Sequence, residues 1–179
     1  MTASLQPVAS AVQRVRSVFR RRPEAAVHDD APATARWQGG TRVVTSHAAG
    51  AQMLTDMPAE LGGTGDQVTP GWLFRAGLAS CATTSIVLAA AAEGIELATL
   101  EVWVGSRSDA RGLLGMNDDA GQPVYAGPSD MQLQVRIDAP GVAQDRVRAL
   151  VEGAVGCSPV PCLVRQATAL GLQLDIVGA

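Results

Sequence analysis

The sequence of 179 residues predicts one α+β domain preceded by a short helical extension. Two observations predict this class. Residues 70–93 are almost continuously small or apolar, which is the pattern of a buried helix. Segments around this helix, most clearly residues 131–138, alternate apolar and polar side chains, as strands with one buried face do. We therefore expect an N-terminal helix and linker in residues 1–33 and the α+β domain in residues 34–179.

The N-terminal segment, residues 3–22, has the pattern of an amphipathic helix. Its apolar residues recur at helical spacing: Leu5, Val8, Val12, Val15 and Phe19. We expect this stripe to pack on the body of the protein or on a partner subunit. A helix that lies on a membrane or docks an anionic partner through its arginines is the alternative. Residues 23–32 are polar and interrupted by prolines, so they predict a linker.

Short strands are expected before the central helix. Residues 35–38 and 41–46 flank Gly39-Gly40, which predicts a β-hairpin, and residues 51–57 form a third candidate strand. The Gly-rich stretch ELGGTGD, residues 60–66, predicts a loop. A phosphate-binding role for this loop is disfavoured, because it lacks the GxxxxGK[ST] pattern.

The central helix has clear start and stop signals. Thr69 can cap its first turn, Pro70 suits its first position, and Gly94 suits its end. Because the helix is apolar or small on nearly every side, we expect it to be buried all round.

The second half of the chain predicts two strands, a helix in two parts and a last strand. The strands are residues 97–106 and 131–138, separated by the loop 109–130. A helix follows the turn at residues 139–142, and Ser158-Pro159 starts its second part, which runs to about Leu170. The alternating residues 172–177 predict the closing strand.

Composition excludes several classes of function. The formal net charge of −3 gives no reason to expect nucleic acid, and the absence of lysine excludes Schiff-base and P-loop lysine chemistry. Residues 1–22 lack an unbroken apolar core, and no stretch looks long and apolar enough to span a bilayer, so we expect a soluble cytoplasmic protein. His28 and His47 stand alone, so neither a metal site nor a bound cofactor is expected.

The cysteines are the candidate chemical groups. Cys81 lies inside the predicted central helix, where a thiol is either a small core residue or, beside a positive charge, a nucleophile. Cys157 and Cys162 lie on either side of the helix start at Ser158-Pro159, where free N–H groups favour a thiolate. Two separated thiols of this kind suit a peroxidatic and a resolving cysteine, or are packing residues.

Three segments resemble the OsmC/Ohr family: TPGWLF with Gly77 and Cys81 following, the Gly-rich residues 61–66, and residues 158–160. The resemblance covers residues 34–177. It implies an OsmC-like fold, in which two central helices pack on antiparallel sheets in an intertwined homodimer with active sites at the subunit interface. It also implies thiol-dependent reduction of organic or inorganic hydroperoxides: the Cys81 thiolate becomes a sulfenic acid, a second cysteine captures it as a disulfide, and a dithiol reduces the enzyme.

Two positions depart from the family pattern. Gly71 stands where the family has a glutamate that orients an arginine, so we expect the matching arginine to be unclamped, without that carboxylate to hold it. Arg42 is the best match for this arginine, Arg36 is a weaker match, and Arg75 is another possible cation. Ser158 stands where the family has its resolving cysteine, so Cys157 or Cys162 would have to serve. These departures support an alternative hypothesis, a dimer of the same fold that binds a small apolar ligand or senses oxidants.

Overall fold

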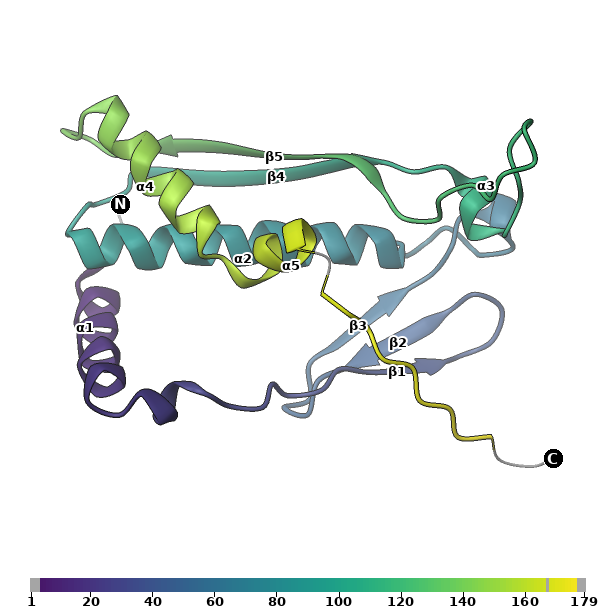
Figure 1. Cartoon of the computed structure of the whole chain (residues 1–179), viewed down its shortest axis with the longest axis horizontal. Helices are drawn as coiled ribbons and strands as arrows, with labels where there is room; N and C mark the ends of the chain where they lie inside the picture. The colour runs from purple at the N-terminus through teal and green to yellow at the C-terminus, as the bar shows by residue number, and fades with distance from the viewer. Residues whose placement is uncertain (1–3, 167, 177–179) are drawn as a thin grey trace.

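The computed structural model describes residues 4–166 and 168–176 and shows an α+β arrangement around one long helix (Figure 1). The helices are α1 (Gln6–Arg21), α2 (Pro70–Glu93), α3 (Ala110–Leu113), α4 (Gln144–Gly156) and α5 (Pro159–Gln166), with single 3₁₀ turns η1 (Pro23–Ala26) and η2 (Ala59–Leu61). The strands are β1 (Thr34–Trp37), β2 (Val43–Ser46), β3 (Gln52–Thr55), β4 (Thr99–Arg107) and β5 (Ser129–Asp138). Because α1, β4, α4 and α5 all pack on α2, this helix is the centre of the structure.

The helix α2 begins and ends where its sequence signals predict. The hydroxyl of Thr69 accepts a hydrogen bond from the backbone N–H of Trp72 at 3.2 Å, and Pro70 occupies the first turn. At the other end Gly94 has a φ of 68°, the left-handed conformation in which glycine closes helices without strain. The buried residues recur every four positions along one side: Leu78, Ala82, Ile86 and Ala90, with Ala91 beside them.

The expectation that α2 is buried on all sides is wrong for the single chain. Trp72, Phe74 and Leu88 are 46%, 38% and 42% exposed. The expectation that no segment is long and apolar enough to span a bilayer is also wrong, because α2 passes that test by length and composition. Only 22% of its 18-residue apolar stretch is buried within the described part of the chain. The side of α2 that bears Phe74 and Leu88 is therefore left open in the described part of the chain.

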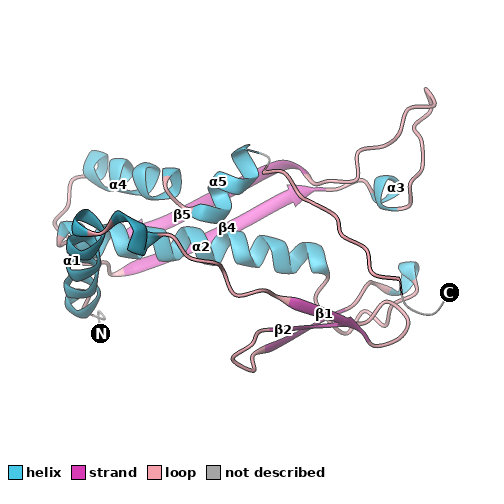
Figure 2. Cartoon of the chain, turned by 60° about the horizontal axis from the view of Figure 1, so that its bottom comes forward, coloured by secondary structure: helices cyan, strands magenta, loops and turns pink. Residues whose placement is uncertain are grey.

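The predicted hairpin and third strand form an antiparallel sheet in the order β1-β2-β3. Trp37 pairs with Val43 across the turn, where Gly39 and Gly40 have φ values of 101° and 56° that other residues rarely adopt. Figures 1 and 2 show this sheet lying apart from β4 and β5. Every residue of β1 is exposed, so this sheet has no core of its own on that strand.

The strands β4 and β5 form a long antiparallel ribbon along α2 (Figure 2). Thr99 pairs with Asp138 at one end and Arg107 with Ser129 at the other, with an irregularity after Gly105. Half-buried and exposed residues alternate along both strands, as the sequence pattern predicts, and β4 is the strand that packs on α2. The connection between the strands contains α3.

The core lies where the end of α2 meets α4. Ala90, Ile95, Ala139 and Leu150 form one buried cluster. The break between α4 and α5 falls at Cys157 and Ser158, as the Ser-Pro signal predicts.

The end of the chain differs from the prediction. Helix α5 ends at Gln166, residues 168–170 are not helical, and residue 167 lies outside the described residues. Residues 172–176 form no strand, and Val177 of the predicted strand is not described. Their apolar side chains alternate as a strand requires, but Leu172, Leu174 and Ile176 are 84%, 73% and 79% exposed. A strand needs a neighbouring sheet edge for its hydrogen bonds, and this segment has none in the part of the chain described here.

The helix α1 packs on α2, as the first of its two interpretations requires. Leu5 contacts the core cluster, whereas Val15 and Phe19 are about half exposed. Their side chains line a largely apolar groove of 650 Å³ between α1, α2 and α4. The linker contains no helix or strand apart from η1.

Candidate thiol site

The thiol of Cys81 lies at the contact between α2 and the break separating α4 from α5. Cys81 is half-buried, and its Sγ lies 3.3 Å from the Oγ of Ser158. Ser158 is completely buried. A hydroxyl at this distance can donate a hydrogen bond to a thiolate or accept one from a thiol, so Ser158 can serve either protonation state of Cys81.

The position of Ser158 follows from the local sequence. Pro159 and Pro161 end the α4 hydrogen-bond pattern and start α5, and Ser158 precedes the first of them. The carbonyl of Ser158 accepts the N–H of Cys162 at 2.9 Å, which closes the first turn of α5. The break in the helix therefore directs the Ser158 side chain to α2 and to Cys81.

The two other cysteines lie on either side of Ser158 and differ in exposure. Cys157 is exposed at the end of α4 and lines the groove between α1, α2 and α4. Cys162 is half-buried, and its Sγ donates to the carbonyl of Gly156 at 3.1 Å. A guanidinium nitrogen of Arg165 lies 3.9 Å from this sulfur and donates to the carbonyl of Val155 at 2.8 Å. The three sequence-predicted thiols are thus gathered around one helix break, with a guanidinium beside one of them.

Arg42 lies in a separate cluster of charged and hydroxyl side chains. Its Nη2 donates to Thr64 Oγ1 at 2.7 Å, to Asp56 Oδ2 at 3.4 Å and to a carboxylate oxygen of Asp66. The expectation that the glycine at position 71 leaves this arginine unclamped is wrong, because two carboxylates hold it. Both come from outside the helix start: Asp56 follows β3, and Asp66 lies in the Gly-rich loop.

Asp56 is the centre of that cluster, although sequence reasoning did not single it out. It is 2% exposed, and its carboxylate accepts hydrogen bonds from the Thr64 hydroxyl at 2.7 Å and the Thr64 N–H at 3.1 Å. Hydrogen bonds from Thr41 and Thr64 hold the pKa of Asp56 far below its usual value. The pKa of Asp66 is also lowered. The largest cause is a hydrogen bond from Thr64, and the next is a hydrogen bond from Arg42.

The Gly-rich loop is part of this cluster rather than a flexible tether. A Cβ at position 63 would lie 1.7 Å from the carbonyl oxygen of Met57, so only glycine allows the loop to approach β3 this closely. The sequence signals that could have indicated this cluster were an aspartate after a predicted strand and a second aspartate in a Gly-rich loop. The positions of these residues along the chain do not show that the two carboxylates lie close together or that both pair with Arg42.

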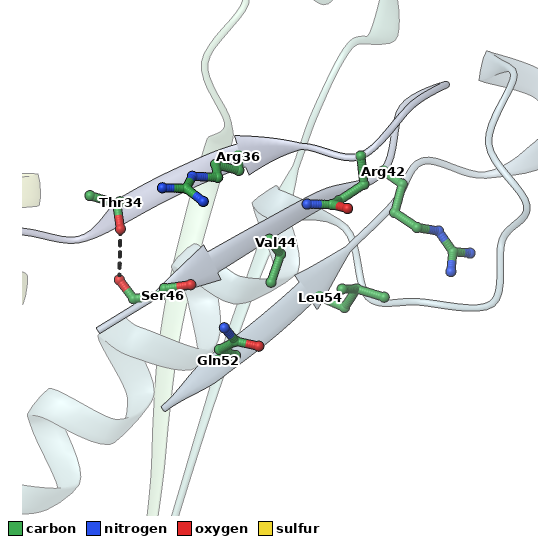
Figure 3. Close-up of a pocket in the computed structure, with 8 residues that line it drawn as sticks. Thr34, Arg36, Arg42, Val44, Ser46, Gln52 and Leu54 are labelled. Atoms are coloured by element: carbon green, nitrogen blue, oxygen red, sulfur yellow. Dashed lines mark hydrogen bonds between the residues drawn. The ribbon is translucent and has the colours of Figure 1, made fainter. Parts of the chain in front are cut away.

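No arginine contacts the Cys81 thiol among the residues that the structure describes. Arg75 lies on α2 and its Nη1 donates to Ser106 on β4 at 3.4 Å. Arg36 and Arg42 line an open hollow of 620 Å³ on one face of the β1–β3 sheet. Figure 3 shows the guanidinium of Arg42 pointing away from Arg36. Cys81 does not line this hollow. Arg36 and Arg42 therefore lie in a different part of the chain from the thiol, and Arg75, on the same helix as Cys81, contacts Ser106 instead.

Histidine and carboxylate side chains form no metal-binding group of three within residues 4–166 and 168–176. His28 lies 3.5 Å from Asp30 at the surface, and His47 accepts the N–H of Ala49. Both contacts are local, with a partner two residues away.

The sequence model of the OsmC-like protein family matches residues 63–173, which include α2, Cys81 and the α4–α5 break. No curated protein matches the chain significantly. Solved structures match at low identity over most of the chain. An OsmC-like protein from Mycoplasma pneumoniae is 18% identical with a TM-score of 0.65, over 78% of this chain and 90% of that one.

Two structures of organic hydroperoxide resistance proteins match similarly. The Legionella pneumophila protein is 24% identical with a TM-score of 0.54, over 78% of this chain and 92% of its own. The protein from Elizabethkingia anophelis is 22% identical with a TM-score of 0.58, over 78% and 91%. At these identities the likeness shows the fold.

Proposed function

Since the chain belongs to the OsmC-like protein family, we propose that it reduces organic or inorganic hydroperoxides, with Cys81 as the attacking thiolate. The observation that carries the proposal is the 3.3 Å contact between Cys81 Sγ and the buried Oγ of Ser158. The family's resolving cysteine matches position 158, and this contact supports that match. The hydroperoxide resistance proteins of the same fold support the same class of substrate.

The proposed reaction begins with attack of the Cys81 thiolate on the distal oxygen of the hydroperoxide. The S–O bond forms as the O–O bond breaks, the sulfur is oxidised to a sulfenic acid, and the leaving alkoxide takes a proton to become the alcohol. The hydroxyl of Ser158 can donate its hydrogen bond to the thiolate before the attack. A second thiol then condenses with the sulfenic acid and releases water, and an external dithiol reduces the disulfide.

A homodimer is part of the proposal. Phe74 and Leu88 lie on one side of α2 and are 38% and 42% exposed in the described part of the chain, and exposed apolar side chains on one helix side are characteristic of an interface. A second copy packed on this side of α2 could bring the β1–β3 sheet of one protomer close to α2 of the other. Arg42 of one protomer is then the candidate cation for the Cys81 thiolate of the other. Its guanidinium is oriented by ion pairs with Asp56 and Asp66.

In the proposed homodimer α2 lies in the protein core and not in a bilayer. Four other elements already pack on it, and its two ends are capped by ordinary loop residues. We accordingly propose a cytoplasmic protein that acts without nucleic acid or membrane.

The test is consumption of cumene hydroperoxide and hydrogen peroxide by the purified protein with dithiothreitol. We expect turnover that disappears in Cys81→Ser, since a hydroxyl cannot replace the thiolate, while the melting temperature changes little. Thr83→Ser, whose hydroxyl keeps its bond to the Ala79 carbonyl on the same helix, serves as the matched control. Wild-type protein that consumes neither peroxide would refute the proposal.

A second function, binding of a small apolar ligand, is favoured by the groove between α1, α2 and α4. Its 650 Å³ lies in the range of ligand pockets, and its lining is mainly apolar. The pH dependence of iodoacetamide alkylation at Cys81 separates the two functions. A thiolate already present near pH 6 supports the peroxidase, whereas alkylation that rises only above pH ~8 supports the binding protein.

A further inference from the structure

Ser158 creates a problem for the proposed reaction, because the residue in contact with Cys81 cannot form a disulfide with it. Resting on the proposed function, we propose that Cys162 and Cys157 resolve the sulfenic acid in sequence and end as a disulfide with each other. The terminal disulfide would then lie at the helix break and not at Cys81. Three observations support this relay: the position of Cys162, its closeness to the backbone of Cys157, and the exposure of Cys157.

Cys162 is the first member because it follows the residue that touches Cys81. Its N–H donates to the carbonyl of Ser158 at 2.9 Å, so it lies one helical turn after Ser158. Ser158 immediately precedes α5, so Cys162 lies in the first turn of the helix that begins next to the residue in contact with Cys81. Arg165 lies 3.9 Å from its sulfur, and a guanidinium stabilises the thiolate that must attack.

Cys157 is close enough to Cys162 to be the second member. The Sγ of Cys162 lies 3.1 Å from the carbonyl oxygen of Gly156, and that carbonyl belongs to the peptide that leads into Cys157. Standard peptide geometry puts this oxygen about 2.8 Å from the next Cα. The sulfur of Cys162 is therefore within about 6 Å of the Cα of Cys157, so the two cysteines are neighbours, and rotation of their side chains with movement of the α4–α5 break would bring the sulfurs together.

The exposure of the thiols gives the relay a direction. Ser158 is completely buried, Cys81 and Cys162 are half-buried, and Cys157 is exposed. A reductant as large as a dithiol protein attacks the sulfur that it can reach, so a disulfide that includes Cys157 is the form most open to reduction.

Each step of the relay balances without a further oxidant. The Cys162 thiol condenses with the Cys81 sulfenic acid, which forms a Cys81–Cys162 disulfide and releases water. The Cys157 thiolate then attacks the sulfur of Cys162, a Cys157–Cys162 disulfide forms, and Cys81 leaves as a thiolate ready for the next peroxide. An external dithiol finally passes two electrons and two protons to the Cys157–Cys162 pair.

The test treats reduced protein with one equivalent of cumene hydroperoxide, alkylates free thiols and maps tryptic peptides by mass spectrometry. Trypsin cuts after Arg148 and Arg165 but nowhere between, so one peptide, 149–165, carries both relay cysteines, while Cys81 lies in another. In wild type we expect peptide 149–165 to lose two hydrogens and resist alkylation. Cys81→Ser should lower this conversion at least about tenfold, because it removes the entry point.

Two further variants test the order. Cys157→Ser should stop the relay at a Cys81–Cys162 disulfide that links the two peptides. Cys162→Ser should leave the Cys81 sulfenic acid open to trapping by dimedone. A Cys81–Cys157 disulfide in the Cys162→Ser protein, formed as fast as the wild-type pair, would overturn the assignment of Cys162 as the first member.

A glutathione redox buffer tests the pairing without peroxide. Cys157 and Cys162 should form their disulfide in the Cys81→Ser protein as in wild type, and a pair that stays reduced at every ratio would overturn the relay. If wild type consumes peroxide while peptide 149–165 stays reduced, the relay is wrong and the peroxidase function stands. If the buffer oxidises the pair but no peroxide is consumed, the peroxidase function is wrong and the relay falls with it.

Discussion

The thiol of Cys81 faces a neutral hydroxyl in the interior of the molecule, whereas the guanidinium of Arg42 lies between two carboxylates beside the Gly-rich loop. The thiol region is built from one helix contact, between α2 and the α4–α5 break. The Arg42 cluster is built from short strands and a loop that have little apolar core. The first region holds the Cys81 thiol, which no described guanidinium contacts, and the second holds the Arg42 guanidinium, which no described thiol contacts.

In the function that we propose, the work of one site is divided between these two parts of the chain. A thiolate in an apolar interior costs free energy unless positive charge is near, while a guanidinium is readily kept beside carboxylates and hydroxyls close to water. Peroxide chemistry needs both together. In the homodimer that we propose, the open side of α2 is the place where the two regions could meet.

Replacement of Arg42 should have the largest effect on the rate of hydroperoxide reduction, because it removes the cation of the second region. We expect Arg42→Met, which keeps the apolar stem, to slow hydroperoxide reduction by roughly 100-fold, as loss of one preorganised charge does at other sites. Arg36→Met is the matched control, because Arg36 lines the same hollow but contacts neither carboxylate of the cluster. Stopped-flow consumption of cumene hydroperoxide measures both. Equal losses in the two variants would show that no specific guanidinium serves Cys81.

Ser158→Cys should turn the hydroxyl contact into a direct disulfide. The 3.3 Å separation of Cys81 Sγ and Ser158 Oγ places two sulfurs near bonding distance after a small adjustment. One equivalent of peroxide should then convert most of the protein to a form in which Cys81 is bonded to the introduced thiol, bypassing the other cysteines. Ser158→Ala controls for loss of the hydroxyl. Peptide mapping that finds no such disulfide would mean that the contact is not maintained in solution.

A charge on the open side of α2 should keep the two regions apart. Phe74 is 38% exposed there, and Phe74→Glu is expected to weaken dimer formation by about 2 kcal/mol or more, roughly 30-fold in the dissociation constant. Light scattering during size exclusion measures the change. Val27→Glu, an 83% exposed apolar residue in the linker, is the control. A wild-type protein that is monomeric at all concentrations would break the proposed link between the regions.

Acid should loosen the Arg42 cluster before it affects the thiol region. The pKa values of Asp56 and Asp66 are lowered in the folded protein, so their contribution to stability is complete above the unfolded value near ~4 and is lost as pH falls below it. We expect the melting temperature to fall by several degrees from pH 5 to pH 2. Asp56→Asn should melt lower at pH 7 and depend less on pH. Asp119→Asn, in an exposed loop, should behave as wild type.

Local signals predicted much of the fold. Thr69, Pro70 and Gly94 set both ends of α2 correctly, and Gly39-Gly40 marked the hairpin, because each acts through the backbone of its own neighbours. Ser158-Pro159 placed the break between α4 and α5 for the same reason. The length of α5 and the last strand were wrong, because neither depends on local preference alone.

The sequence by itself determined the central helix, most of the strands, and which residue types the chemistry has available. Only the tertiary structure decided that Ser158 touches Cys81, that Asp56 and Asp66 hold Arg42, and that one side of α2 stays open. Capping and turn formation depend on residues a few positions apart, and the sequence displays those directly. Contacts across 77 or 24 positions depend on how whole elements pack, and spacing along the chain carries no measure of that.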